Sequence, residues 1–292
     1  MRIATWNVNS LKARLEKVVW WLDRAQPDVL LMQETKLKDA DAPVAAFRDR
    51  GYELAHHGEG RWNGVAIASR VGIVDVVANF GEPLRPAETR EAGDDEPFAE
   101  ARMIAARCGD LRVVSIYAPN GRRVDSPFYE AKLLWYERLA RWVCEVSRPE
   151  DALVIGGDFN VAPADADVWN PAAAHGGTHV SPRERAAFTA LCRCGFVDAY
   201  RIHHTEPERY TWWDYRAGDF HRNIGMRIDH VLVTQPLTSR VVWTEIDREA
   251  RKGKPTPSDH APLVIDLDSA GKPFDAGWAS ADERVAARRK TS

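Results

Sequence analysis

The sequence has few cysteines, and their arrangement argues against a metal or redox role. Only 4 of the 292 residues are cysteine, and they have neither a C-x-x-C spacing nor the density of a disulfide framework. We therefore expect reduced cysteines that serve mainly in packing. The four are Cys108, Cys144, Cys192 and Cys194.

Long apolar runs and an excess of basic charge are also absent. No stretch reaches the length needed to cross a bilayer, and residues 1–5 lead into a strand-like pattern without a signal-peptide core, so we expect a cytoplasmic protein without membrane contact. The net charge of −3 gives no global support for nucleic-acid binding. Any such binding therefore has to come from local basic patches.

What is present is an ordinary globular composition with alternating helical and strand-like segments. Hydrophobic residues make up 45% of the chain, which is enough for a sizeable core in one domain. Apolar spacing predicts helices at 11–22, 127–146 and 183–192, and Ser10 is a plausible N-cap. Strands are predicted at 2–9, 29–36, 64–69, 73–77, 102–107, 111–117, 152–155, 211–213, 228–233 and 261–267. Residues 83–97 have the mixed charge and prolines of an exposed loop, and residues 269–292 the small polar composition of a peripheral tail.

The stretch 152–160 organises the rest of the prediction. Its apolar run ends in Gly156 and Gly157, followed by Asp158 and Asn160, and this pattern predicts a buried strand that delivers polar groups to a cleft. The glycines lack a Cβ, which permits close approach by another backbone or a phosphate. Taken alone, the stretch is explained better by an ordinary strand that ends in an Asx turn.

Several other predicted strands also end in polar side chains. Carboxylate and carboxamide oxygens gathered at one cleft suit a hard divalent cation such as Mg²⁺, and a histidine beside carboxylates can move a proton or stabilise developing negative charge. Individually, each residue has a structural explanation as a turn former, a helix-start carboxylate or a strand-edge charge. The set comprises Asn7, Asn9, Glu34, Tyr117, Asp158, Asn160, Asp229, Asp259 and His260.

Six short motifs in order resemble those of the bacterial exonuclease III family of abasic-site endonucleases, within the endonuclease/exonuclease/phosphatase superfamily. The motifs are residues 6–14 (WNVNSLKAR), 33–36 (QETK), 117–121 (YAPNG), 157–160 (GDFN), 227–230 (RIDH) and 258–260 (SDH). The resemblance covers residues 1–268, which we take as a single catalytic domain. It implies an α/β fold of four layers, in which two mixed β-sheets pack face to face between outer helices.

The resemblance also implies roles for individual residues. Glu34 matches the principal Mg²⁺ ligand, with Mn²⁺ a substitute, and Asp158 matches the carboxylate that orients or deprotonates the attacking water. His260, positioned by Asp229, matches the residue that contacts the scissile phosphate, whose shell Asn7 and Tyr117 complete. The implied metal-side set is Asn9, Glu34, Asp158, Asn160 and Asp259.

A DNA substrate is implied by the residues that resemble the family's abasic-site recognition region. Trp212, Met226 and Ile228 match its apolar pocket, and one of Trp212 and Trp213 should be a core residue because alternate residues face opposite sides. Candidate DNA contacts beside the cleft are Arg90, Arg122, Arg123, Arg216, Arg222 and Asn223, with 251–254 (RKGK) as further phosphate contacts.

The implied activity is incision of double-stranded DNA at abasic sites and trimming of blocked 3′ ends. The resemblance further implies a monomer that is associated with the nucleoid. Two alternatives stay open at this point: a phosphatase of the same superfamily that acts on a small phosphoester, and a DNA-binding protein without catalysis.

Overall fold

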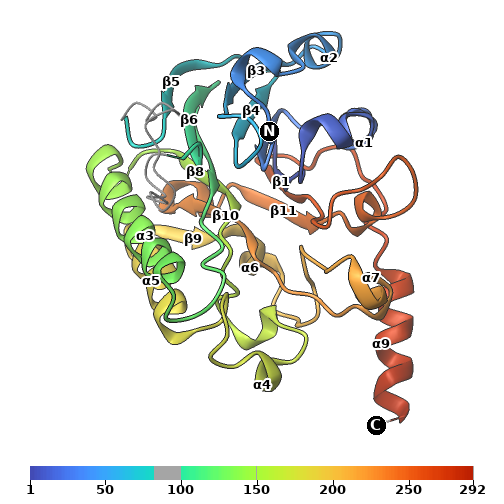
Figure 1. The fold of residues 1–292 in the computed structure, drawn as a ribbon. Coiled ribbons are helices and arrows are strands. Elements are labelled where there is room, and N and C mark those ends of the chain that lie inside the picture. Colours follow the sequence, from blue (N-terminus) through green and yellow to red (C-terminus); the bar gives the residue numbers. More distant parts are fainter. Residues whose placement is uncertain (82–99, 149, 292) are drawn as a thin grey trace.

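The computed structural model describes residues 1–81, 100–148 and 150–291, and within them two six-stranded sheets form the centre of the fold (Figure 1). Arg90 and the predicted loop at 83–97 lie outside the described residues. The first sheet has the order β11-β12-β1-β2-β4-β3 and the second the order β5-β6-β7-β8-β10-β9. Both sheets are mixed, since β1 and β2 are parallel, as are β7 and β8, while the other neighbours are antiparallel.

The strand bounds of the first sheet are β1 (Arg2–Asn7), β2 (Val29–Gln33), β3 (Glu53–His57), β4 (Val65–Ser69), β11 (Val241–Ile246) and β12 (Leu263–Leu267). Those of the second are β5 (Val74–Ala78), β6 (Met103–Cys108), β7 (Leu111–Tyr117), β8 (Leu153–Asp158), β9 (Phe196–Asp198) and β10 (Asp229–Thr234). The longer helices are α1 (Leu11–Ala25), α3 (Pro127–Val146), α5 (Pro182–Cys192) and α9 (Ala279–Thr291). The shorter ones are α2 (Val44–Arg48), α4 (Pro171–Ala174), α6 (Ala199–His203), α7 (Asp219–Arg222) and α8 (Gln235–Thr238).

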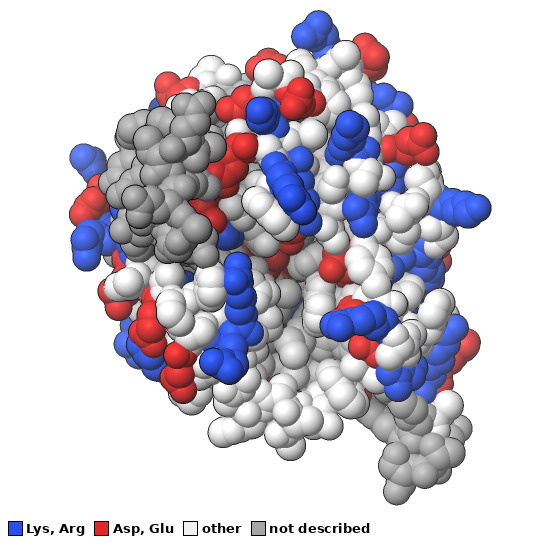
Figure 2. Space-filling model, viewed as in Figure 1, with Lys and Arg blue, Asp and Glu red and all other residues white. Residues whose placement is uncertain are grey.

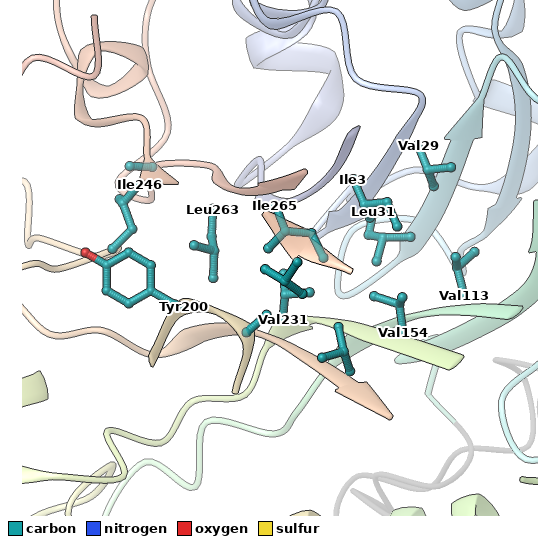
Figure 3. Packing of buried hydrophobic residues seen from close by; sticks show 14 of the residues in the cluster. Ile3, Val29, Leu31, Val113, Val154, Tyr200, Val231, Ile246, Leu263 and Ile265 are labelled. Atoms are coloured by element: carbon teal, nitrogen blue, oxygen red, sulfur yellow. The ribbon is translucent and has the colours of Figure 1, made fainter. Parts of the chain in front are cut away.

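Alternation of side chains along the strands builds the layers. On β1, Ile3 points into the core between the two sheets, whereas Trp6 points outward and packs on Trp21 of α1, with ring centroids 5.6 Å apart. On β8, Val154 belongs to the same inter-sheet core, which Figure 3 shows, whereas Ile155 packs on the α3 side. The result is the predicted four-layered sandwich, with α1 outside one sheet and α3 and α5 outside the other (Figure 1).

Hydroxyl caps define where the three long outer helices begin. Ser10, Ser126 and Ser181 accept hydrogen bonds from the backbone N–H groups of Ala13, Tyr129 and Glu184. Such caps satisfy donors that have no partner within the helix. The predicted helices at 11–22, 127–146 and 183–192 are confirmed, as is Ser10 as an N-cap.

The two glycines of β8 are required by close packing of protein against protein. A Cβ on Gly157 would lie 2.0 Å from the Ile116 carbonyl oxygen of the neighbouring β7, and one on Gly156 would lie 2.7 Å from the Leu31 side chain of the facing sheet. The close approach expected from the sequence therefore comes from β7 and β2. Gly157 therefore lets β8 lie close to β7 within its own sheet, and Gly156 lets β8 lie close to β2 of the facing sheet.

Several local expectations are wrong. Residues 211–213 make only isolated bridges, of Trp212 with Met226 and with His260, while β3, β9 and β11 were not predicted because their patterns mix apolar and polar residues. The tail beyond residue 268 is less peripheral than expected, since Trp278 is buried in the inter-sheet core cluster and its indole donates to the Ile246 carbonyl at 2.9 Å.

The expectation that all cysteines are reduced is also wrong. Cys144, near the end of α3, forms a disulfide with Cys194, just beyond α5, and their Cα atoms are 5.8 Å apart. The two residues are 50 positions apart in the chain, so only the packing of α3 on α5 brings them together. Cys108 and Cys192 are free thiols. Among the described residues, no helix has the length and apolar content to cross a bilayer.

Candidate active site

The candidate site lies where strands from both sheets end at the same edge of the sandwich. Asn7 is the last residue of β1, Glu34 follows β2, and Asp158 is the last residue of β8. Because β10 runs antiparallel to β8, its first residue, Asp229, pairs directly with Asp158. His260 lies shortly before β12, which is antiparallel to β1. The topology therefore gathers polar side chains that are more than 200 residues apart.

Asn7 links the carboxylates of the two sheets. Its Nδ2 donates to Glu34 Oε1 at 2.8 Å and to Asp158 Oδ2 at 2.9 Å, and the residue is fully buried. Glu34 is partly exposed, and its carboxylate pairs with the Lys36 ammonium at 2.8 Å. A buried carboxamide that donates to two carboxylates fixes their separation, so the acidic centre is preorganised.

His260 and Asp229 form a buried hydrogen-bonded pair. The distance from His260 Nδ1 to Asp229 Oδ2 is 2.8 Å, and the opposite ring nitrogen, Nε2, lies 3.9 Å from Asp158 Oδ2. Burial alone would lower the pKa of His260, but the charge and hydrogen bond of Asp229 outweigh it and raise the pKa to about 10. The imidazole is therefore held in its positively charged form.

The surroundings of Asp158, in contrast, favour its uncharged form. Burial, reinforced by the negative charge of Asp229, raises the pKa of Asp158 to about 7. Its Oδ1 accepts the backbone N–H of Asn160 at 2.9 Å, and the Asn160 amide donates to the Ala118 carbonyl at 2.9 Å. A carboxylate whose pKa lies near neutrality, beside a cationic imidazole, is suited to exchange protons with a bound water.

Tyr117, at the end of β7, forms another wall of the site. Burial raises the pKa of its hydroxyl well above the ordinary value, so the phenol keeps its proton. The Arg102 guanidinium lies over the ring, 4.8 Å from its centroid, and is itself paired with Glu100. Tyr117 can therefore donate a hydrogen bond but cannot act as a base at neutral pH.

The Asp259 carboxylate joins the polar centre to an apolar surface. Asn9 Nδ2 donates to its Oδ1 at 2.9 Å, and Trp212 Nε1 donates to its Oδ2 at 3.2 Å. Trp212 and Met226 are partly buried and pack against a small cluster that contains Ile228. Trp213 is fully buried, which confirms that one of the two tryptophans is a core residue.

A buried ion pair lies directly behind Asn160. Lys132 on α3 and Glu184 on α5 are both completely buried, with Nζ 2.5 Å from Oε1. The same ammonium donates to the Asn160 carbonyl at 2.7 Å and to the Asn120 carbonyl at 3.3 Å. This pair therefore holds the two loops that carry Asn120 and Asn160, and the sequence did not reveal it because it joins two outer helices.

The predicted DNA contacts fall into different environments. Figure 2 shows basic side chains around a central hollow that has acidic side chains within it. Arg122 and Arg123 are exposed, and Arg216 and Arg222 are exposed but paired with Asp214 at 2.5 Å and Asp219 at 2.7 Å. Asn223 is 1% exposed, accepts from Trp213 Nε1 and donates to the Glu208 carbonyl, so the expectation of a DNA contact there is wrong.

Sequence reasoning missed two residues at the rim. Trp62 is 62% exposed in the loop before β4, and the neighbouring Asn63 carbonyl accepts the Lys36 N–H at 2.9 Å, so this loop adjoins the Glu34 side of the site. His179 donates from Nδ1 to the Asn160 carbonyl, 2.7 Å away. An aromatic residue in the polar, glycine-rich stretch 58–64 was the available signal for Trp62.

The donor set fits a divalent metal ion. Glu34, Asp158 and His260 each offer an atom within 4.8 Å of the others. Asp229 Oδ1 is buried without a hydrogen-bond partner, which marks additional negative charge behind the site. Carboxylate oxygens with neighbouring carboxamides suit Mg²⁺ or Mn²⁺ better than Zn²⁺, which favours nitrogen and sulfur ligands.

This sandwich and its site define a phosphoester hydrolase of the nuclease type. The sequence profile described as the Endonuclease/Exonuclease/phosphatase family matches residues 4–260. The chain belongs to this family, in the group that contains exodeoxyribonuclease III. The resemblance drawn from the six motifs is thereby confirmed.

Relatives match over nearly their whole length. Exodeoxyribonuclease III of Haemophilus influenzae is 31% identical over 278 residues, which cover 90% of this chain and 98% of the relative. An AP endonuclease from Archaeoglobus fulgidus has a TM-score of 0.83 and 37% identity, covering 92% of this chain and all of that one. The 3′ phosphatase NExo from Neisseria, bound to a product DNA hairpin, has a TM-score of 0.82 and 38% identity, with coverage of 92% and 100%.

Proposed function

We propose that the protein is a Mg²⁺-dependent DNA repair hydrolase that cleaves the phosphodiester 5′ to an abasic site and trims 3′ ends. The products would be a 3′ hydroxyl and a 5′ phosphate, and 3′-to-5′ exonuclease and 3′-phosphodiesterase or phosphatase action would use the same site. The observation that carries the proposal is that Asn7 joins Glu34 to Asp158 by hydrogen bonds, while Nε2 of the Asp229-bound His260 lies 3.9 Å from Asp158.

Glu34 would be the main ligand of the metal, with Asn9, Asp158, Asn160 and Asp259 on the same side. The ion, Mg²⁺ or in its place Mn²⁺, would neutralise charge on the phosphate when bound. This assignment rests on the oxygen-rich donor set and on the unpaired buried oxygen of Asp229.

The residues of the chain would divide the remaining chemistry between them. Asp158, with a pKa near neutrality, would accept a proton from water as the water oxygen bonds to phosphorus and the bond from phosphorus to the 3′ oxygen breaks. Protonated His260 would stabilise the negative charge that grows on the phosphoryl oxygens. Asn7 and the protonated Tyr117 would complete the shell of donors, and Tyr117 would protonate the departing oxygen.

The apolar surface beside Asp259 favours DNA damage as the substrate. Trp212, Met226 and Ile228 offer a shallow apolar contact for a baseless sugar, and extrusion costs least where no base is stacked. A monomer in the cytoplasm, associated with the nucleoid, is the form in which we propose that the enzyme acts. Its catalytic domain would comprise residues 1–268, together with the buried Trp278 of the tail.

A competition assay tests the proposal. The protein is incubated with Mg²⁺ and three substrates: a duplex with one abasic-site analogue, the intact duplex, and an inositol or nucleoside phosphate. We expect rapid cleavage of the first, slow 3′ trimming of the second and no turnover of the third. Preferred consumption of the small phosphoester would establish the phosphatase alternative, and binding without cleavage would establish the non-catalytic one.

Two controls link the activity to this site. Glu34→Ala and Asp158→Ala should each lower kcat by several orders of magnitude, because each removes a group that acts on the reacting atoms. Removal of divalent cations by EDTA should abolish cleavage. A near-normal rate in EDTA would contradict the proposed metal dependence.

A further inference from the structure

The arginine at position 251 is buried, and its Nε has no hydrogen-bond acceptor among the residues that the structure describes. It lies in the short 3₁₀ turn Arg248–Arg251 and is 8% exposed. Across the described part of the chain, no carboxylate lies within ion-pair distance of this guanidinium. Its contacts are aromatic, with Cζ 4.7 Å from the ring centroid of Tyr215 and 5.1 Å from that of Phe220.

A second arginine approaches the same phenol from α1. Arg14, in the first turns of that helix, donates from Nη2 to the Tyr215 hydroxyl at 3.2 Å, and its Nε is likewise buried without a partner. The Tyr215 hydroxyl in turn donates to the Pro257 carbonyl at 2.9 Å. Two guanidinium groups thus flank one tyrosine, and neither has a carboxylate within ion-pair distance among the residues that the structure describes.

The charged side chains near Arg251 differ from it, because they have ion-pair partners. Asp214 and Asp219, which lie on the same cavity as Arg251, are already paired with Arg216 and Arg222, and Lys252 is paired with Glu249 at 2.6 Å. The cavity has a volume of about 380 Å³, and Tyr215, Phe220, Arg251 and Pro257 line it. Among the described residues that line the cavity, the unpaired positive charge therefore comes from Arg251, and Arg14 lies next to the cavity through its hydrogen bond to Tyr215.

Burial of a guanidinium without a directly paired carboxylate is unfavourable, and the Asp259 carboxylate attracts Arg251 only from beyond ion-pair distance. An anion with several acceptor oxygens would relieve the cost. The forked donors of arginine match a phosphate in particular. Pro257 is two residues from Asp259, whose carboxylate lies at the candidate active site. An anion held in this cavity would therefore lie next to the DNA strand that is cleaved.

We infer that Arg14, Tyr215 and Arg251 form a binding site for a phosphodiester group of the DNA backbone, next to the site of cleavage. This inference rests on the proposed function and assigns a position to one non-reacting phosphate of the bound strand. The Arg14–Tyr215–Arg251 site would fix the register of the strand on the enzyme and would not contact the reacting atoms.

The test measures DNA affinity as a function of salt in EDTA, so that the strand is not cut. Each neutralised phosphate contributes about 0.9 to the slope of log K against log salt. Arg14→Gln should reduce the slope by about 0.9, whereas its melting temperature should stay close to that of the wild type because Arg14 is partly exposed. Arg251→Gln should reduce the slope by a similar amount relative to that of the wild type.

Arg240→Gln is the matched control, because it removes the same charge from a side chain that is paired with Asp268 beside the start of β11. The inference is overturned if Arg14→Gln has the wild-type slope, or if Arg240→Gln loses as much.

Failure of this inference is distinguishable from failure of the proposed function. If the wild type cleaves the abasic duplex but Arg14→Gln retains the full slope, only the phosphate site is wrong. If the wild type does not cleave DNA, the proposed function is wrong. Arg251→Gln can fail to fold because Arg251 packs between two rings, and in that case Arg14→Gln alone decides the outcome.

Discussion

Replacement of Lys132 by methionine tests whether the buried ion pair behind Asn160 sets the geometry of the active site. Methionine has nearly the length of lysine, so the change removes the charge and the three donors without opening a large cavity. It leaves Glu184 buried and without its cation, and it leaves the Asn120 carbonyl without the lysine donor.

The expected loss of stability follows from the burial of both partners. Loss of one member of a fully buried pair costs about 3–5 kcal/mol of unfolding free energy, because the remaining charge is desolvated and uncompensated. We expect a value near the lower end, about 3 kcal/mol, since Ser181, Thr178 and the His179 N–H still donate to Glu184. Addition of Glu184→Gln to Lys132→Met should recover part of the loss, because it removes the unpaired charge.

Urea unfolding followed by tryptophan fluorescence measures the free energies, and the two single variants and the double variant complete a mutant cycle. Lys272→Met is the matched control, because it removes a lysine whose side chain is exposed, and it should change stability by less than about 0.5 kcal/mol.

Activity provides the second measurement. The Asn160 loop is held by the Lys132 ammonium, and a displacement of about 1 Å at a catalytic group can lower kcat roughly 100-fold. We therefore expect kcat on an abasic duplex to fall at a temperature where Lys132→Met is fully folded, with a smaller change in KM. The reasoning is refuted if the unfolding free energy of Lys132→Met is within about 1 kcal/mol of that of the wild type and its kcat is unchanged. It is also refuted if the double variant is less stable than Lys132→Met.

Four further predictions concern the site and its rim. Wild-type activity should rise near pH 7 as Asp158 ionises and fall near pH 10 as His260 loses its proton. A bound divalent cation would lower the pKa of Asp158 and so move the acid limb of the profile to lower pH. Asp229→Asn should lower the pKa of His260 and move the alkaline limb of the pH–kcat profile to lower pH. The acid limb should move to lower pH as well, because Asp229 also raises the pKa of Asp158. An unchanged alkaline limb would exclude His260 as its source. Trp62→Ala should weaken DNA binding by about 1 kcal/mol or more if the exposed indole stacks on DNA, with unchanged stability, and equal affinity by fluorescence anisotropy would remove Trp62 from the interface. Trp212→Ala should reduce incision at abasic sites more than trimming of an ordinary 3′ end, and parallel losses on the two substrates would indicate a general structural role.

The sequence by itself determined the local elements and the identity of most groups at the site. Helices α1, α3 and α5 carry an apolar stripe and a hydroxyl cap, so short-range spacing was sufficient to predict them. Glu34, Asp158 and His260 stand in short motifs at or near the ends of strands, and the order of these motifs along the chain identified the family. Periodicity alone would not have given the four-layered arrangement, which came from the resemblance.

The tertiary structure decided the contacts between segments that are distant in the chain. The 3.9 Å approach of His260 to Asp158, the Lys132–Glu184 pair and the Cys144–Cys194 disulfide each require two elements to be packed in a particular register. Strands β3, β9 and β11 exist because neighbouring strands supply hydrogen-bonding partners, which a single sequence does not display. Burial decided the remainder, because it depends on what the rest of the chain places around each side chain. Arg122 is exposed and Asn223 is enclosed by the protein, while Arg251 is buried and its Nε has no hydrogen-bond acceptor among the described residues.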